Sequence, residues 1–302
     1  MKSRVAVVYG GTSSEALVSE MSAKQIITHM PSGYKAKLIE YTPCIDQDLS
    51  AFAPDVVYPA MHGVPGEDGS FQGFLETLGI PYVGSSVAAS AIAIDKYLSK
   101  IIYRSLGLQT PEGWVIRSSD QRFGAYKKLS RMVFKPLNQG SAIGVKIMDT
   151  NMAEKEFESR LRPFLLEEWI QGREITAGIL EINGVAVNLP IVETITPPGT
   201  FNSYDLKYRS DKKSRLIPAP LEEPMQDLVH RAALAAHLGL GCRDFSRTDF
   251  IVTDDQAYIL ETNTLPGMTE FSSYPAAARI FGLEFGELLD QLISNALQRV
   301  VN

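Results

Sequence analysis

The stretch RTDFIVTDDQAYILETN, residues 247–263, decides the fold of the C-terminal part of this chain. Two apolar runs flank the acidic turn Asp254-Asp255, a pattern that predicts a β-hairpin. Glu261 and Asn263 are two residues apart and share one face of a strand. If three residues close the hairpin, Asp249 lies directly across from Glu261, whereas a slip of one residue sends it to the other face. Two carboxylates and an amide oxygen together suit Mg²⁺. The alternative is a solvated pair of charged strands.

The composition is that of an ordinary globular protein. The chain has 302 residues, 45% hydrophobic and 21% charged, with a net charge of −6. These values exclude a disordered, collagen-like or coiled-coil chain, and the mild acidity argues against a nucleic-acid partner. The two cysteines do not make a disulfide framework, and no stretch reaches the roughly 18 apolar residues of a membrane span. We therefore expect a cytoplasmic protein with no membrane partner.

Strands and helices alternate in the first third of the chain. We predict strands at residues 5–9, 36–41, 55–59 and 81–84, with helices at 15–29, 71–78 and 86–93. Such alternation is typical of an open parallel sheet. The sequence therefore predicts an α/β domain at the N-terminus.

The pattern changes after a predicted helix at residues 96–106. Short strands follow at 114–117, 132–136, 143–148 and 165–169, with helices at 120–129 and 151–161. Strands 174–181 and 185–192 flank Asn183-Gly184, the strongest short signal for a hairpin. The long polar segment 197–220 is typical of a lid or binding loop. Helices at 224–238 and 285–300 complete the C-terminal part.

Two further segments have the chemistry of a nucleotide site. Lys135 ends a strand and precedes a polar loop with two glycines, an arrangement that can hold phosphate oxygens but also fits an ordinary glycine hairpin. Glu167, Glu168 and Glu174 surround Trp169 and suit an adenosine site, although salt-bridged surface glutamates give the same pattern.

Two glycine-containing loops can serve a second substrate. Residues 60–69 are glycine-dense and contain His62, so this loop either positions an amino acid or forms a capped surface turn. Pro266-Gly267 can present a backbone N–H group to a developing oxyanion, although Pro-Gly is most often simply a turn.

Taken in order, these segments closely resemble the D-alanine–D-alanine ligases of the ATP-grasp superfamily. The resemblance runs over essentially the whole chain, through residues 9–15, 62–69, Gln72-Gly73, Asp95-Lys96, 135–144, 167–174, Lys207-Tyr208 and 247–269. It implies an α/β fold that is α+β in its C-terminal part. An N-terminal parallel α/β sheet domain, residues 1–95, would precede a two-domain ATP-grasp fold. That fold would comprise a small central domain, 96–172, and a C-terminal domain with the metal site and lid, 173–302.

The resemblance also implies how ATP and metal are bound. Lysines would contact the phosphates, a carboxylate and strand backbone would read adenine, and a second carboxylate would take the ribose. The implied ATP-binding residues are Lys96, Lys135, Glu167, Glu168, Ile170 and Glu174. Asp249, Glu261 and Asn263 would hold two Mg²⁺ ions, or Mn²⁺ in their place.

The implied reaction begins when one D-alanine carboxylate attacks the γ-phosphate of ATP to give an acyl phosphate. The amine of a second D-alanine then displaces phosphate, giving D-alanyl-D-alanine for peptidoglycan synthesis. Arg247 and the Gly267 N–H group would stabilise the tetrahedral intermediate. Glu15 would hold the ammonium group of the first substrate, with His62 beside it.

The remaining implied residues belong to the lid and the second-substrate pocket. Ser141 and Tyr208 would join Glu15 in a hydrogen-bonded set that orients the lid. Lys207 would reach a phosphate or the carboxylate of the second substrate, near Ser272 and Ser273. A tyrosine at 208 predicts an amine nucleophile, because the relatives that use D-lactate carry a histidine there, whose positive charge repels an ammonium group.

Several positions depart from the usual family pattern. Ala142 stands where a second serine is common, and Ser272-Ser273 replaces a Ser-Leu pair. These departures keep two alternatives open: an ATP-grasp amino-acid ligase with a different second substrate, and a non-catalytic nucleotide-binding regulator. We expect D-alanine and ATP as ligands, and a homodimer.

Overall fold

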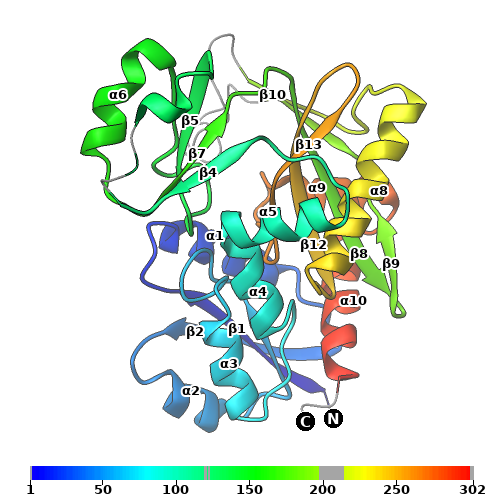
Figure 1. Cartoon of the computed structure of the whole chain (residues 1–302). Helices are drawn as coiled ribbons and strands as arrows, with labels where there is room; N and C mark the ends of the chain where they lie inside the picture. Colours follow the sequence, from blue (N-terminus) through cyan, green and yellow to red (C-terminus); the bar gives the residue numbers. More distant parts are fainter. Residues whose placement is uncertain (1, 119–120, 122, 197–213, 300–302) are drawn as a thin grey trace.

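The computed structural model describes residues 2–118, 121, 123–196 and 214–299, and contains three β-sheets. In Figure 1 the N-terminal sheet lies at the bottom, a second sheet at the upper left, and the C-terminal sheet on the right. The sequence-based fold class, a parallel α/β part followed by antiparallel sheets, is confirmed.

The N-terminal sheet is parallel and has the order β2-β1-β3. Its strands are β1 (Ser3–Gly10), β2 (Tyr34–Tyr41) and β3 (Val56–Pro59). They are joined by α1 (Ala16–Thr28) and α2 (Ile45–Phe52), and α3 (Ser70–Thr77) and α4 (Val87–Ile94) follow β3. Residues 5–8 of β1 are fully buried, as expected for a continuous apolar run covered on both faces. The predicted strand at 81–84 is reduced to a single bridge between Tyr82 and Val57.

The second sheet is antiparallel, with the order β4-β7-β5-β6. It consists of β4 (Gly113–Ile116), β5 (Arg131–Pro136), β6 (Lys146–Asp149) and β7 (Phe164–Glu168), with α6 (Thr150–Ser159) packed against it. The predicted helix at 120–129 is wrong, because in its described part only a 3₁₀ turn forms, at Phe123–Tyr126. Both ends of this turn pack on Phe157, and a single 3₁₀ turn places residues i and i+3 on the same side.

The C-terminal sheet has the order β11-β10-β8-β12-β13, and β9 also pairs with β8. These strands are β8 (Arg173–Ile182), β9 (Val185–Asn188), β10 (Val192–Ile195), β11 (Ser214–Leu216), β12 (Phe245–Val252) and β13 (Ala257–Asn263). The predicted hairpin at Asn183-Gly184 is confirmed, and both turn residues have positive φ, 53° and 78°. The strand predicted at 185–192 is two strands, interrupted at Pro190, which has no N–H group for a ladder.

The register of β12 against β13 places Asp249 directly across from Glu261, as the sequence predicted. The closing loop, residues 253–256, is one residue longer than the three assumed. Phe250 pairs with Ile259, so Leu260 is the extra residue of a β-bulge that restores the pairing. The two carboxylates therefore share a face despite the longer loop.

The described residues also form the helices α5 (Lys96–Ser105), α8 (Glu223–Gly239), α9 (Ser273–Phe281) and α10 (Phe285–Leu297). α5 and α8 pack on the C-terminal sheet, while α10 contacts both β3 and β8. Val5 and Val7 consequently belong to the same buried core as Leu180, Phe245 and Leu292. This shared core joins the N-terminal and C-terminal sheets and fixes the loops between them.

Candidate active site

One pocket collects residues from the two antiparallel sheets and from loops that follow strands of the N-terminal sheet. It is lined by every described residue that the sequence nominated: Glu15, His62, Lys96, Lys135, Ser141, Glu167, Glu168, Ile170, Glu174, Arg247, Asp249, Glu261, Asn263, Gly267, Ser272 and Ser273. Lys207 and Tyr208 lie outside the described residues. The individual roles of these residues stay predictions, but the structure brings them together.

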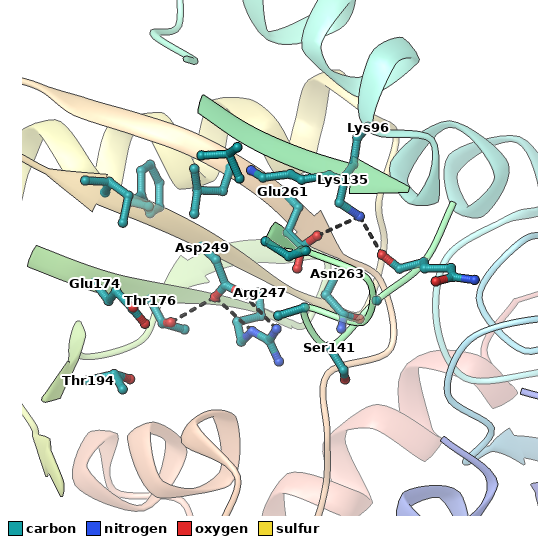
Figure 2. A pocket seen from close by; sticks show the side chains of 18 of the residues that line it. Lys96, Lys135, Ser141, Glu174, Thr176, Thr194, Arg247, Asp249, Glu261 and Asn263 are labelled. Atoms are coloured by element: carbon teal, nitrogen blue, oxygen red, sulfur yellow. Dashed lines mark hydrogen bonds and ion pairs between the residues drawn. The ribbon is translucent and has the colours of Figure 1, made fainter. Parts of the chain in front are cut away.

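The acidic pair of the β12–β13 hairpin lies on the pocket wall (Figure 2). Thr176 donates a hydrogen bond to Asp249 Oδ1 at 2.8 Å, and Arg247 Nη2 lies 2.8 Å from Asp249 Oδ2. Glu261 Oε2 lies 3.0 Å from Lys96 Nζ. These partners offset the cost of placing two carboxylates in a partly buried wall.

The oxygen donors of this wall fit Mg²⁺ in kind and number. Asp249 and Glu261 supply carboxylates, and Asn263 supplies an amide oxygen that also accepts a hydrogen bond from Leu265 N at 2.8 Å. Mg²⁺ needs few protein ligands, since water and phosphate oxygens complete its coordination. Within the described residues, no cluster of three or more His, Cys, Asp or Glu offers an alternative metal site.

Lys96 connects three elements at the pocket floor. It is the first residue of α5, whose N-terminus is capped by the Asp95 carboxylate through Tyr97 N at 2.9 Å and Leu98 N at 3.0 Å. Its ammonium group donates to the carbonyl oxygen of Gln139 at 2.7 Å and pairs with Glu261, as Figure 2 shows. The Lys96 side chain is thus held between α5, the 137–145 loop and β13.

A buried charged triad lies next to this floor. Glu167 is 1% exposed, and each of its carboxylate oxygens pairs with a lysine, Lys100 or Lys135. Burial favours the neutral form of Glu167, yet the two lysines hold the pKa of this carboxyl below its usual range. The sequence analysis missed Lys100. Its spacing of four residues from Lys96 places both lysines on one side of a helix, which was the available signal.

The loop that follows β5 touches the N-terminal part of the chain. Ser141 Oγ donates to Glu15 Oε1, and a Cβ atom added at Gly140 would lie 3.2 Å from Glu15 Oε2. Ser141 and Ala142 both have positive φ, 53° and 58°, which costs on the order of 1 kcal/mol each. The contact with the buried Glu15 helps to hold this unfavourable backbone.

His62 connects the glycine-dense loop to the Pro-Gly loop. Its Nε2 atom lies 2.9 Å from Ser22 Oγ, which accepts a hydrogen bond from Met268 N at 3.4 Å. Its Nδ1 atom lies 3.6 Å from the Glu67 carboxylate, a pocket residue that the sequence analysis did not single out. The two loops are therefore fixed relative to one another beside Gly267.

Gly267 packs tightly against the start of α9. Ser272 Oγ accepts a hydrogen bond from Thr269 N at 3.1 Å and lies 2.9 Å from Thr269 Oγ1. A Cβ atom added at Gly267 would lie 2.8 Å from Ser272 Oγ, closer than real Cβ atoms come. The sequence analysis did not predict α9, whose N-terminus begins at Ser273 on the pocket edge.

Comparisons with known proteins agree with this geometry. The family described as D-ala D-ala ligase C-terminus matches residues 110–294, and the family described as D-ala D-ala ligase N-terminus matches residues 42–85. A D-alanine–D-alanine ligase from Citrifermentans bemidjiense is 38% identical over 99% of this chain and 98% of its own length. The chain belongs to the D-alanine–D-alanine ligase family.

Solved structures of this ligase family superpose on the whole chain. The ligase from Bacillus anthracis complexed with ATP has a TM-score of 0.83 and 32% identity, covering 98% of each chain. The VanG D-Ala:D-Ser ligase from Enterococcus faecalis has a TM-score of 0.79 and 26% identity, covering 97% of this chain and 99% of its own. The predicted family and the ATP-grasp fold are therefore confirmed.

Ser273 and Phe271 both line the pocket, and Phe271 is 57% exposed. Elsewhere, none of the helices in the described part of the chain is long and apolar enough to cross a membrane.

Proposed function

We propose that this protein is an ATP-dependent ligase that joins two D-alanines through an acyl phosphate and supplies D-alanyl-D-alanine for peptidoglycan. One observation carries the proposal: a single pocket combines Lys96, Lys135 and the Asp249–Glu261 pair with the buried carboxylate of Glu15. The two lysines and the two carboxylates suit a nucleoside triphosphate with its metal ions, and the Glu15 carboxylate suits the ammonium group of an amino acid.

ATP would lie between the two antiparallel sheets. Lys96 and Lys135 would contact its phosphates, and Glu174 would accept from the ribose hydroxyls. Glu167 and the backbone of residues 168–170, which line the pocket, would face adenine. Phosphoryl transfer of this kind depends mainly on positioning and on charge stabilisation.

Asp249, Glu261 and Asn263 would hold two Mg²⁺ ions. Mg²⁺ bound there would supply positive charge to the transferring phosphoryl group. Lys96 would then neutralise the rest of the charge around Glu261, to which it is paired at 3.0 Å.

The chain itself would orient both amino acids. Glu15, held by Ser141, would fix the ammonium group of the first D-alanine so that its carboxylate points toward the phosphates. Arg247, aligned by Asp249, and the Gly267 N–H group would stabilise the oxyanion that forms when the second amine attacks. Two reactants held in this way react as if at very high effective concentration.

Several finer statements belong to the same proposal. We propose that Tyr208 and Lys207 act in the lid as the family resemblance implies, and that the domain boundaries lie near residues 95 and 172. We also propose that the enzyme works in the cytoplasm, where ATP is available, and that it is a homodimer, which light scattering tests directly.

A different second substrate is the competing function. Ser273 places a hydroxyl-bearing residue on the pocket edge, and one structural relative is described as a D-Ala:D-Ser ligase. A small polar side chain on the second amino acid would find a hydrogen-bonding partner there.

The test is phosphate release from ATP and Mg²⁺, with the products identified by mass. D-Alanine alone should give D-alanyl-D-alanine, and a panel of second substrates with D-serine and D-lactate measures the preference. Rates for D-serine exceeding those for D-alanine would favour the competing function. Depsipeptide from D-lactate exceeding dipeptide at neutral pH would contradict the role of Tyr208. If no amino acid gives phosphate release or a ligated product, the ligase proposal is refuted.

A further inference from the structure

We propose that Lys100 is a positioning residue for nucleobase selection: from behind the pocket it fixes the Glu167 carboxylate, and through it Lys135, in the arrangement that accepts adenine and rejects guanine. The inference rests on the proposed nucleotide-binding role of Glu167 and Lys135. It adds a residue that is not on the pocket surface, since the residues lining the pocket include Glu167 and Lys135 but not Lys100.

In the buried triad, Lys135 and Glu167 face the pocket, and Lys100 lies on the side of Glu167 away from it. Lys100 is 2% exposed, and its ammonium group donates to Thr110 Oγ1 and, at 3.2 Å, to the carbonyl oxygen of Pro111. It pairs with Glu167 Oε1, whereas Lys135 pairs with Glu167 Oε2. All three donor positions of the Lys100 amine are therefore occupied by protein groups, and the residue has no contact left for a ligand.

Stability does not account for a lysine at this position. Removing an ammonium group from water is costly, and a buried ion pair is often no more stable than well-packed apolar residues of similar size. α5 already packs on the C-terminal sheet through Tyr103, which is fully buried. A charged residue one turn before it has a purpose other than packing.

The chemistry of the base edge supplies that purpose. Adenine presents an amino group, a donor, beside the acceptor N7, whereas guanine presents the acceptor O6 beside N7. An ionised Glu167 can only accept hydrogen bonds. The Lys135 ammonium group, which has further donors for the phosphates, can only donate. This pair is complementary to adenine and repels guanine O6, but only while Glu167 remains ionised and its carboxylate keeps its position. A protonated Glu167 could donate to O6, and the selection would be lost.

Lys100 favours the ionised form of Glu167 and holds its carboxylate in place. The charged groups that face Lys100 are Glu167 from β7, Lys135 from β5 and Arg104 from the next turn of α5. Burial lowers the pKa of the Lys100 amine to about 8, with Glu167 opposing the shift and Lys135 adding to it. Above this pH Lys100 becomes neutral, and Glu167, which stays ionised in alkaline solution, loses the charged partner that fixes the position of its carboxylate.

The experiment measures equilibrium binding of ATP and GTP, each with Mg²⁺, so that its outcome does not depend on ligase turnover. The variants are Lys100→Met, which removes the charge, and Lys100→Arg, which keeps a charge that does not titrate. Lys127→Met, at a 58% exposed side chain, is the matched control. The measurements span pH 6.5 to 9.5.

We expect Lys100→Met to weaken ATP binding at least tenfold and to lower the ATP:GTP preference at least tenfold, with Lys127→Met within twofold of the wild type. ATP binding by the wild type should weaken above about pH 8, and the Lys100→Arg variant should lack this weakening. An unchanged ATP:GTP preference in folded Lys100→Met would overturn the proposal. If that variant does not fold, an identical pH dependence in the wild type and Lys100→Arg would overturn it instead. Failure of the ligase proposal would appear separately, as nucleotide binding without peptide formation.

Discussion

Replacement of Gly267 by alanine tests the account of the Pro-Gly loop. The added Cβ atom would lie 2.8 Å from Ser272 Oγ, so one of them must move by about 0.6 Å to reach the 3.4 Å of ordinary contact. If Ser272 rotates away, its hydrogen bonds with Thr269 are lost, at roughly 1 kcal/mol each. If the loop moves instead, the Gly267 N–H group leaves its place. Loss of such an oxyanion donor costs about 100- to 1000-fold in turnover.

We therefore expect Gly267→Ala to lower kcat/KM for the second D-alanine about 100-fold, while the free energy of unfolding falls by no more than about 2 kcal/mol. Gly33→Ala is the matched control, because an added Cβ there has nothing within 4 Å and the φ angle is not positive. Phosphate release measures the rate, and urea denaturation measures the stability.

A double-mutant cycle separates the steric cause from others. In a Ser272→Ala background the 2.8 Å contact no longer exists, so Gly267→Ala should cost at least tenfold less there than in the wild type. The reasoning would be refuted by a Gly267→Ala enzyme within twofold of wild-type rate, or by an equal cost in both backgrounds.

Three other predictions follow from the same structure. Glu261→Gln should abolish turnover and weaken Mg²⁺-dependent ATP binding at least 100-fold, because a metal ligand is lost. Glu223→Gln, at an exposed site, should change neither turnover nor binding. Calorimetric titration of ATP into both variants measures the binding. Leu292→Ala should lower the free energy of unfolding by about 3–5 kcal/mol, because it opens a cavity in the core shared by two sheets; a loss below 1 kcal/mol in urea denaturation would contradict the shared core. Burial raises the pKa of the Cys242 thiol to about 12, so at pH 8 a thiol reagent should label the exposed Cys44 rapidly and Cys242 only after unfolding. Rapid labelling of both thiols in the folded protein would contradict the burial of Cys242.

The sequence predicted the acidic hairpin well, because side chains alternate strictly along a strand. Asp249 and Glu261 had to share a face if their residues paired, and the pairing is as expected. The longer loop and the bulge at Leu260 could not be predicted. The extra residue in the loop and the extra residue at Leu260 offset each other, so Asp249 still lies across from Glu261.

The missed elements have local signals that tertiary packing overrides. α9 carries Pro275 at its third residue, where a helix N–H has no partner inside the helix, so this proline is tolerated there. In the described part of the predicted helix 120–129, a single 3₁₀ turn forms, and its aromatic residues pack on Phe157.

The candidate site also contains residues that the sequence could nominate and residues that only the fold reveals. Residues within recognisable motifs, such as Lys135 and Asn263, could be nominated from their order along the chain and line the pocket. For Lys100 the sequence offered only its spacing from Lys96, because lysine is almost never fully buried and its partner Glu167 lies on β7, far along the chain. Glu67 lies within the glycine-dense loop of residues 60–69, but only the fold shows that it contacts His62.

The most direct test of the central claim follows one oxygen atom. The enzyme is supplied with ATP, Mg²⁺ and D-alanine labelled with ¹⁸O in its carboxylate, and the released phosphate and the dipeptide are analysed by mass. If the carboxylate attacks the γ-phosphate, each phosphate released with D-alanyl-D-alanine carries one ¹⁸O atom. Dipeptide formation with unlabelled phosphate would contradict the acyl phosphate, and with it the arrangement of Glu15, Lys96 and the acidic hairpin around one phosphoryl group.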